Sequence, residues 1–330
     1  MAGGAEPDRA GGRPRWLTAV VLVALVLASS GAGVQRLVED PIAPASVDPL
    51  HKAADVAAAH AASEAGKVTP DVLQPFRGLS PWLDTYDTEL TADQQVGIAA
   101  AEGVDTLFVQ TARESTEGLV HDPARIARTI ELAHDHGMQV VLWTIPDFED
   151  LDRDRARAIA AIEFTTPRGD RADAFGLDIE VEDVAFHMAR TRRLLQLSEE
   201  LRAHAGWGYP MAAIVLPPLQ LEINPRWWRD FPYAELAATY DVTVPMSYSS
   251  YRGSDAAITL QWNRDNVTRV RELIGDPDHP VHLAGGIANA LPEVESFVRA
   301  VQESGAIGGG LYDLHTTPPE AWAPLRALAR

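Results

Sequence analysis

From Pro75 to the C-terminus, short apolar runs alternate with amphipathic stretches eight times, and this alternation constrains the fold more than any other feature. Most of the runs are almost continuously apolar, as parallel strands are when packed elements cover both of their faces. We expect strands at 77–83, 106–110, 139–145, 174–181, 211–216, 242–247, 281–284 and 309–312. A strand, a helix and a further strand at this period form a right-handed parallel unit.

The stretches between the runs carry the signals of helix ends. Thr91 and Gln94 fit a capping box, Asp122 followed by proline fits a helix start, and Gly137 and Gly305 fit helix ends. Eight strand–helix units in about 255 residues match the size of a closed barrel. The sequence therefore predicts an α/β fold, a single (β/α)8 TIM barrel over residues 73–330. An open, doubly wound sheet is the alternative.

The first 72 residues differ from the rest of the chain. Residues 1–15 form a flank with three arginines, and residues 16–34 carry no charge. A basic flank before an apolar run is typical of a signal peptide, and the run is also long enough for a transmembrane signal anchor. Residues 35–72, rich in proline and alanine, are expected to be a tether. The arginines place the flank in the cytoplasm, so we expect an extracytoplasmic barrel, secreted or anchored to the cytoplasmic membrane through residues 16–34.

Composition excludes several classes of function. The formal net charge of −19 repels phosphate backbones, so we expect no nucleic acid partner. The absence of cysteine excludes disulfides, thiol nucleophiles and thiolate metal sites. The only lysines, Lys52 and Lys67, precede the predicted barrel, which excludes Schiff-base chemistry within it. We expect no cofactor.

In a barrel of this kind, the active site lies at the C-terminal ends of the strands. The predicted strand ends are rich in carboxylates and aromatic rings, and they contain few bases. Aromatic faces combined with polar side chains at such a rim fit a groove for sugars. The residues expected to bind substrate are Trp82, Asp84, Gln110, Trp143, Met246, Tyr312 and Asp313.

The fourth predicted strand alternates apolar and acidic residues. Asp178, Glu180 and Glu182 share one face of it, with successive backbones about 6.5–7 Å apart. Since the apolar face must pack under the helices, the acids are expected to face the barrel interior. Like charges this close raise the pKa of at least one carboxyl, and a carboxylic acid still protonated near neutral pH suits general acid catalysis. Three acids also suit a metal ion, but no histidine motif accompanies them, so we expect none.

The stretch from Phe175 to Glu182 resembles the fourth-strand signature of family 18 glycoside hydrolases, the chitinase-like barrels. The pattern of that family is Asp-Gly-x-Asp-x-Asp-x-Glu. Gly176, Asp178 and Glu182 match it, whereas Phe175 and Glu180 depart from it.

A second segment adds to the resemblance, since Met246-Ser247-Tyr248 is similar to the Met-x-Tyr at the end of that family's sixth strand. The resemblance implies that Glu182 protonates the leaving oxygen. It also implies that Glu180 orients the substrate's own acetamido group, which acts as the nucleophile with retention of configuration, and that Tyr248 hydrogen-bonds this group.

Residues 177–180 also resemble the Asp-x-Glu of family 25 lysozyme-like barrels, which would make Glu180 the acid and Asp178 the assisting carboxylate. Both frames imply a glycoside hydrolase that cleaves N-acetylated polysaccharide, either chitin-type or peptidoglycan. Two alternatives stay open. One is a catalytically inactive barrel that binds glycan, and the other is a metabolic barrel that binds phosphate at Gly285-Gly286 and at residues 308–310.

Overall fold

The structure, a computed structural model, describes residues 70–253, 255–287 and 290–330. The predicted cytoplasmic flank, the signal or anchor segment and the tether up to residue 69 lie outside the described residues. Within the described ranges, no helix combines the length and the apolar character that a membrane span needs. The predicted barrel, by contrast, is described almost throughout.

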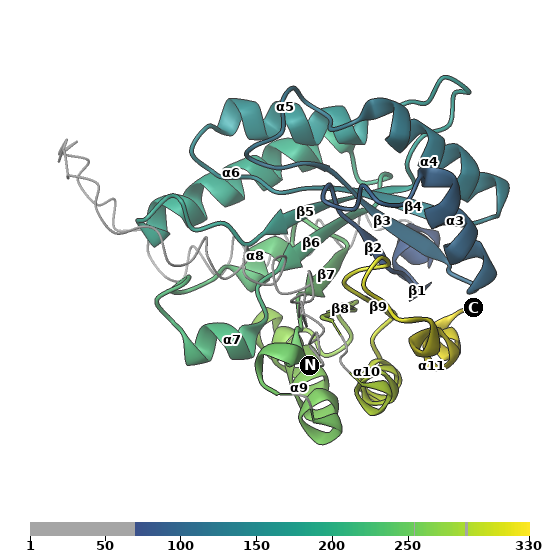
Figure 1. Cartoon of the computed structure of the whole chain (residues 1–330). Coiled ribbons are helices and arrows are strands. Elements are labelled where there is room, and N and C mark those ends of the chain that lie inside the picture. Colours follow the sequence, from purple (N-terminus) through teal and green to yellow (C-terminus); the bar gives the residue numbers. More distant parts are fainter. Residues whose placement is uncertain (1–69, 254, 288–289) are drawn as a thin grey trace, which may run out of the picture. The chain divides into compact units, whose positions relative to one another are not determined.

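Parallel strands form the centre of the described domain (Figure 1). They are β1 (Gly78–Leu79), β2 (Trp82–Leu83), β3 (Thr106–Ala112), β4 (Gln139–Thr144), β5 (Ala174–Ile179), β6 (Met211–Val215), β7 (Val242–Pro245), β8 (His282–Gly285) and β9 (Gly308–Leu311). Hydrogen bonds arrange them as a six-stranded sheet, in the order β2-β3-β4-β5-β6-β7, and a three-stranded sheet, in the order β1-β9-β8. Their positions follow the eight predicted runs, of which the first is split into β1 and β2.

The split at Ser80-Pro81 joins the two sheets. Ser80 N donates to Gly309 O in β9 at 3.2 Å, and Phe108 N in β3 donates to Pro81 O at 3.1 Å. At the opposite edges, two isolated parallel bridges connect the β7 segment to the β8 segment. Pairing therefore follows the chain around a curled, parallel, barrel-like sheet and returns to the first run. The α/β class and the barrel-like curl are confirmed, and no described strand breaks the order as a doubly wound sheet would.

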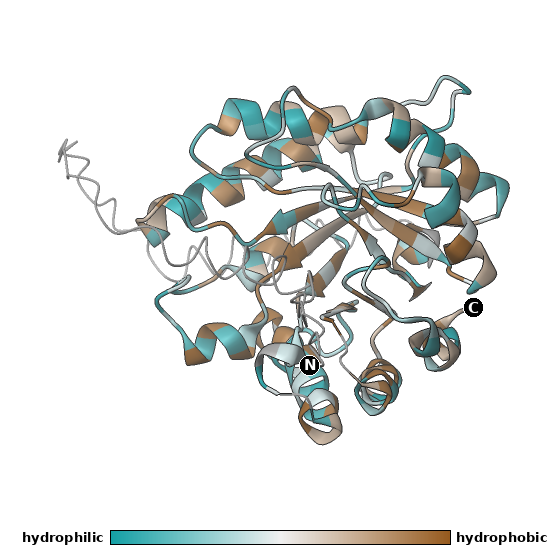
Figure 2. Cartoon of the chain, in the orientation of Figure 1, coloured by the Kyte–Doolittle hydropathy of each residue, from teal (hydrophilic) through white to brown (hydrophobic). Residues whose placement is uncertain are grey.

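Helices lie outside the curled sheet (Figure 1). The α-helices are α3 (Ala92–Ala101), α4 (Pro123–Asp135), α5 (Leu151–Ile162), α6 (His187–Ala205), α7 (Pro218–Ile223), α8 (Tyr233–Ala237), α9 (Ala256–Ile274), α10 (Leu291–Ser304) and α11 (Trp322–Leu325). Short 3-10 turns are η1 (Pro70–Phe76), η2 (Ser249–Tyr251), η3 (Pro319–Ala321) and η4 (Arg326–Leu328). Hydrophobic residues concentrate on the strands, while the helices carry faces of both kinds (Figure 2).

The predicted helix ends are confirmed. The Thr91 side chain accepts from Gln94 N at 3.3 Å and Gln94 Oε1 accepts from Thr91 N at 2.9 Å, which is the expected capping box of α3. Asp122 caps α4 by accepting from the backbone N–H three residues later at 3.1 Å. Gly137 and Gly305 follow α4 and α10 with φ of 76° and 65°, the left-handed backbone that glycine adopts without steric cost.

Aromatic side chains fill the interior of the curled sheet. The Trp82 ring stacks on Phe108 at a centroid distance of 4.4 Å and meets the edge of Trp143 at 5.6 Å. Trp143 pairs in register with Gly176, where an added Cβ would lie 2.8 Å from Ile214 Cδ1 and 3.4 Å from Trp143 Cβ. Gly176 therefore makes room for its neighbours on the inner face. Since side chains alternate along a strand, the residue two positions later in β5 faces the same interior.

Candidate active site

Asp178 is the last inward-facing residue of β5. Its side chain is only 4% exposed, and its Oδ1 is buried without a hydrogen-bond partner among the described residues. Its partner in the register of β6 is Ile214, which offers no side-chain donor. Burial, followed by the charge of Glu180, raises the pKa of Asp178 well above its usual range. A carboxyl in this environment favours its protonated form.

Glu180 follows directly after β5 and is half-buried. Burial, and then the carboxylate of Glu114, raise its pKa from 4.5 to about 7. Glu114 lies in the loop after β3, which ends at Ala112. Asp178, Glu180 and Glu114 thus place three carboxyl groups at the C-terminal ends of β5 and β3, the two strands that flank β4. The sequence reasoning missed Glu114 because it stopped at the end of the predicted strand.

The expectation of three acids on one strand face is wrong for two of them. β5 ends at Ile179, so Glu180 and Glu182 belong to the following loop. The neighbouring segments fit this end, because the register that pairs β5 with β4 and β6 would bring Pro146 next to Ile179 and Pro217 next to Val181. Proline has no N–H and cannot extend a ladder of hydrogen bonds.

Glu182 has a different charged neighbour from the other two acids. The pKa of this half-buried carboxyl is raised overall, because the effect of burial exceeds the opposing effect of the Arg190 guanidinium. Arg190 belongs to α6 in the outer layer, where it lies 4.1 Å from the Trp228 ring centroid and donates to Trp227 O. The structure therefore brings Asp178 and Glu180 together, and it places Glu182 beside a cation that favours its ionised form.

The predicted aromatic residues divide into two groups. Trp82 and Trp143 are each 2% exposed, so their rings are part of the interior packing. Tyr248 and Tyr312 are half-buried, with ring centroids 6.0 Å apart, and Tyr312 lies 6.4 Å from Trp82. The two tyrosine rings are therefore the members of this set that solvent reaches. Met246, two residues before Tyr248, is buried.

Polar residues of the first and last strand ends form a second group. Tyr312 Oη donates to Asp84 Oδ2 at 2.6 Å. Gln110, which was predicted to bind substrate, accepts a hydrogen bond from Thr85 N through its Oε1 at 3.0 Å. Its side chain therefore fixes the loop after β2. Asp313 is buried, and one ligand oxygen each from Asp84, Asp313 and Asp87 lie within 4.8 Å of one another.

Two glycines of the phosphate-binding alternative, Gly308 and Gly310, have a packing role. An added Cβ at Gly308 would lie 2.7 Å from the Gly78 backbone, and one at Gly310 would lie 2.0 Å from Ser80 O. Both distances are too short for a real Cβ, so β9 needs glycine to lie against the first strand. Packing alone accounts for these glycines.

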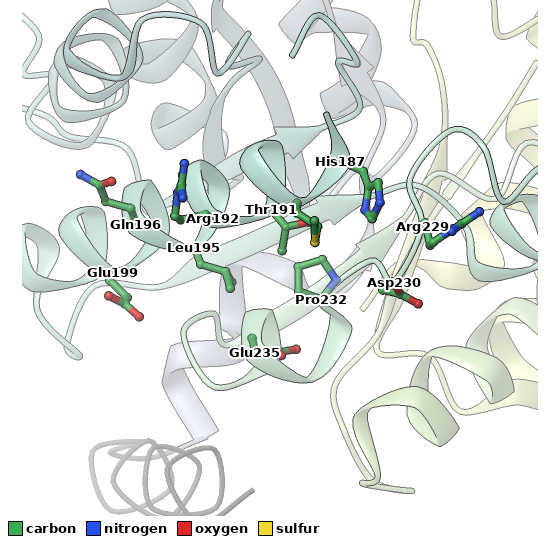
Figure 3. Close-up of a pocket in the computed structure, with 11 residues that line it drawn as sticks. His187, Thr191, Arg192, Leu195, Gln196, Glu199, Arg229, Asp230, Pro232 and Glu235 are labelled. Atoms are coloured by element: carbon green, nitrogen blue, oxygen red, sulfur yellow. The ribbon is translucent and has the colours of Figure 1, made fainter. Parts of the chain in front are cut away.

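A cavity of about 520 Å³ lies between α6 and the segment leading into α8 (Figure 3). Figure 3 shows Thr191 and Leu195 of α6 facing Pro232 and Glu235 across it. Its lining carries charges of both signs and contains none of the predicted site residues. The candidate active site is therefore the group of acids at the end of β5, with the two tyrosines nearby.

Solved structures share this fold. The spore cortex-lytic enzyme SleL of Bacillus cereus matches with a TM-score of 0.59 at 8% identity, over 77% of this chain and 74% of that one. A chitinase from Bacteroides thetaiotaomicron gives 0.55 at 13% identity, over 77% and 96%. The endo-beta-1,4-mannanase from Thermotoga petrophila gives 0.54 at 12% identity, over 73% and 69%.

No protein-family model matches the sequence, and neither does any curated protein. At these identities the solved structures show the fold alone. The expected resemblance to glycoside hydrolase barrels, chitinase-like ones included, is confirmed at that level.

Proposed function

We propose that residues 73–330 form a closed (β/α)8 barrel that hydrolyses N-acetylated polysaccharide, chitin-type or peptidoglycan, with Glu180 as the general acid. The observation that carries the proposal is the pair formed by the buried Asp178 and the half-buried Glu180 at the end of β5. A pKa of about 7 leaves about half of the Glu180 carboxyls protonated at neutral pH, which suits proton donation. Glu182 is the weaker candidate, because Arg190 partly offsets the rise in its pKa that burial causes.

In the proposed reaction, Glu180 donates its proton to the glycosidic oxygen as the bond from that oxygen to the anomeric carbon breaks. The acetamido oxygen of the same sugar forms the new bond to the anomeric carbon, so the substrate supplies the nucleophile. Water then attacks the anomeric carbon, returns a proton to Glu180 and restores the acetamido group, with net retention. Asp178 orients the acetamido N–H in this scheme, and Tyr248 hydrogen-bonds the acetamido group.

The remaining assignments extend the same proposal. Tyr248 and Tyr312 offer rings to the sugar, while Trp82 and Trp143 support them from the interior. Residues 16–34 direct export of the barrel. A signal peptidase then removes this segment, or the segment stays and anchors the barrel to the cytoplasmic membrane, with residues 35–72 as the tether. The fold shared with a spore cortex-lytic enzyme and a chitinase supports a glycan as the ligand.

The proposal is tested by the release of reducing ends from peptidoglycan, chitin oligomers and a non-acetylated β-glucan. The full-length protein is compared with Glu180→Gln and Glu182→Gln. We expect cleavage of the acetylated glycans only, and a loss of about 10²–10⁴-fold in Glu180→Gln. Binding of a glycan without cleavage would instead make the protein an inactive glycan reader. A loss confined to Glu182→Gln would transfer the acid role to that residue.

A further inference from the structure

Three aspartates from opposite ends of the barrel sequence meet where its first and last strands lie side by side. Asp84 and Asp87 follow β2, and Asp313 follows β9, which pairs with β1. One carboxylate oxygen from each lies within 4.8 Å of the other two. Asp87 and Asp313 are 9% and 6% exposed, so two of the three carboxyls are removed from water.

Hydrogen bonds account for only part of this cluster. Asp84 accepts from the Tyr312 hydroxyl and from the Tyr86 N–H, and Asp313 Oδ1 accepts from Thr316 N at 2.7 Å. Asp87 Oδ2, in contrast, is buried and has no partner among the described residues. In the same loop Thr85 Oγ1 is also buried without one. A buried oxygen without a donor requires an explanation, and a bound ion is one.

The nearby cationic side chains form no ion pair with these three aspartates in the described structure, and their closest contacts are with other groups. Arg125 Nη2 donates to Asp87 O, Leu90 O and Gln95 Oε1, all of them uncharged acceptors. The Arg113 guanidinium lies 4.0 Å from the ring centroid of Tyr86. His315 faces Glu89, with Nε2 3.8 Å from a carboxylate oxygen. Three carboxylates therefore share a small volume without a side-chain cation paired to them in the described structure.

We propose that Asp84, Asp87 and Asp313 bind a divalent cation, with calcium preferred over magnesium. The donors are oxygens only, which suits a hard cation. Calcium accepts several carboxylates in a flexible geometry, whereas magnesium demands a near-ideal octahedron and keeps most of its water. The three oxygens lie within 4.8 Å of one another, which is inside the span that the ligands of one calcium ion cover. An adjoining cavity of about 60 Å³, lined by Asp84, Thr85 and Asp87 among others, gives room for coordinating water.

In this proposal Asp84 and Asp313, which were expected to bind substrate, bind a cation and not the sugar itself. It connects the loop after the first strand to the loop after the last one, so the ion closes the barrel at the point where the chain returns to its start. Binding to the folded state alone stabilises that state by mass action. The expected consequence is a barrel whose melting temperature depends on calcium, whether or not it cleaves glycan.

The experiment uses the full-length protein after treatment with a chelator, with no glycan present. Calcium chloride is titrated by calorimetry and by thermal unfolding, and magnesium chloride is titrated in parallel. We expect one calcium site with a Kd of about 10⁻⁴ M and a melting temperature raised by about 5 °C at a hundredfold excess. Magnesium should produce a smaller shift at the same concentration.

Two variants test the assignment against a matched control. Asp87→Asn and Asp313→Asn should fold in the absence of calcium and lose its effect on the melting temperature. Asp152→Asn, on a side chain that is 91% exposed in α5, should respond as the wild type does. The proposal is overturned if calcium leaves the wild-type melting temperature unchanged, or if Asp87→Asn and Asp313→Asn keep the full calcium response.

Discussion

Replacement of Glu180 by glutamine should lower the activity and raise the free energy of unfolding, because the environment of this side chain opposes its charge. Burial and the neighbouring Glu114 raise the pKa of Glu180 from 4.5 to about 7. Between these two values the unfolded chain releases a proton that the folded chain keeps. The stabilising contribution is therefore complete below the unfolded pKa and is lost as the pH rises through the folded pKa. At about 1.4 kcal/mol per pKa unit, the loss is about 3 kcal/mol.

Glutamine does not ionise, so Glu180→Gln should escape this loss. We expect equal melting temperatures near pH 4.5, and a variant more stable by about 3 kcal/mol near pH 8. For a barrel of this size, that difference corresponds to about 6–12 °C. Thermal unfolding followed by circular dichroism at several pH values measures it, with the exposed Glu117→Gln as control. A difference that does not grow with pH would refute the assignment of Glu180 as a half-buried acid whose charge has no compensating partner.

Two further substitutions test the surroundings of the site and the barrel that supports it. Glu114→Gln removes a negative neighbour of Glu180, so the pKa of the acid falls and the alkaline limb of the pH–rate profile moves to lower pH, whereas Glu117→Gln should leave the limb in place. In the wild type, the buried Arg202 guanidinium lies 2.8 Å from the Asp241 carboxylate. Asp241→Ala leaves this guanidinium without its charged partner. Urea denaturation should show a loss of about 3–5 kcal/mol in the free energy of unfolding, and a loss below about 1 kcal/mol would mean that the pair is effectively solvated.

The sequence predicted the parts of the fold that depend on local patterns. Continuous apolar runs marked the strands, because both faces of a parallel barrel strand are covered. The capping box at Thr91 and the glycines after α4 and α10 marked helix ends, because their geometry needs only a few neighbouring residues. Asp178 was predicted to face the interior from alternation alone, and its burial agrees with that.

The remaining features depend on contacts between distant segments. β5 stops at Ile179, where a proline follows the end of each neighbouring strand, and the sequence of β5 itself does not carry this information. The first strand divides at Ser80-Pro81 because its two halves pair with different neighbours. The approach of Asp313 to the loop after β2 follows from closure of the sheet, so no local motif marks it. Pairing between distant segments determines these features, whereas local propensity determines where the helices and strands lie.

The central claim is that Glu180 donates the proton to the leaving group, and substrates that differ in their need for that proton test it most directly. The dinitrophenolate group of a dinitrophenyl glycoside of N-acetylglucosamine leaves without protonation. The sugar oxygen that leaves from a chitin oligomer needs a proton. The account predicts that Glu180→Gln loses about 10²–10⁴-fold on the oligomer and retains most of its rate on the dinitrophenyl glycoside. Equal losses on both substrates, or this split in Glu182→Gln instead, would contradict it.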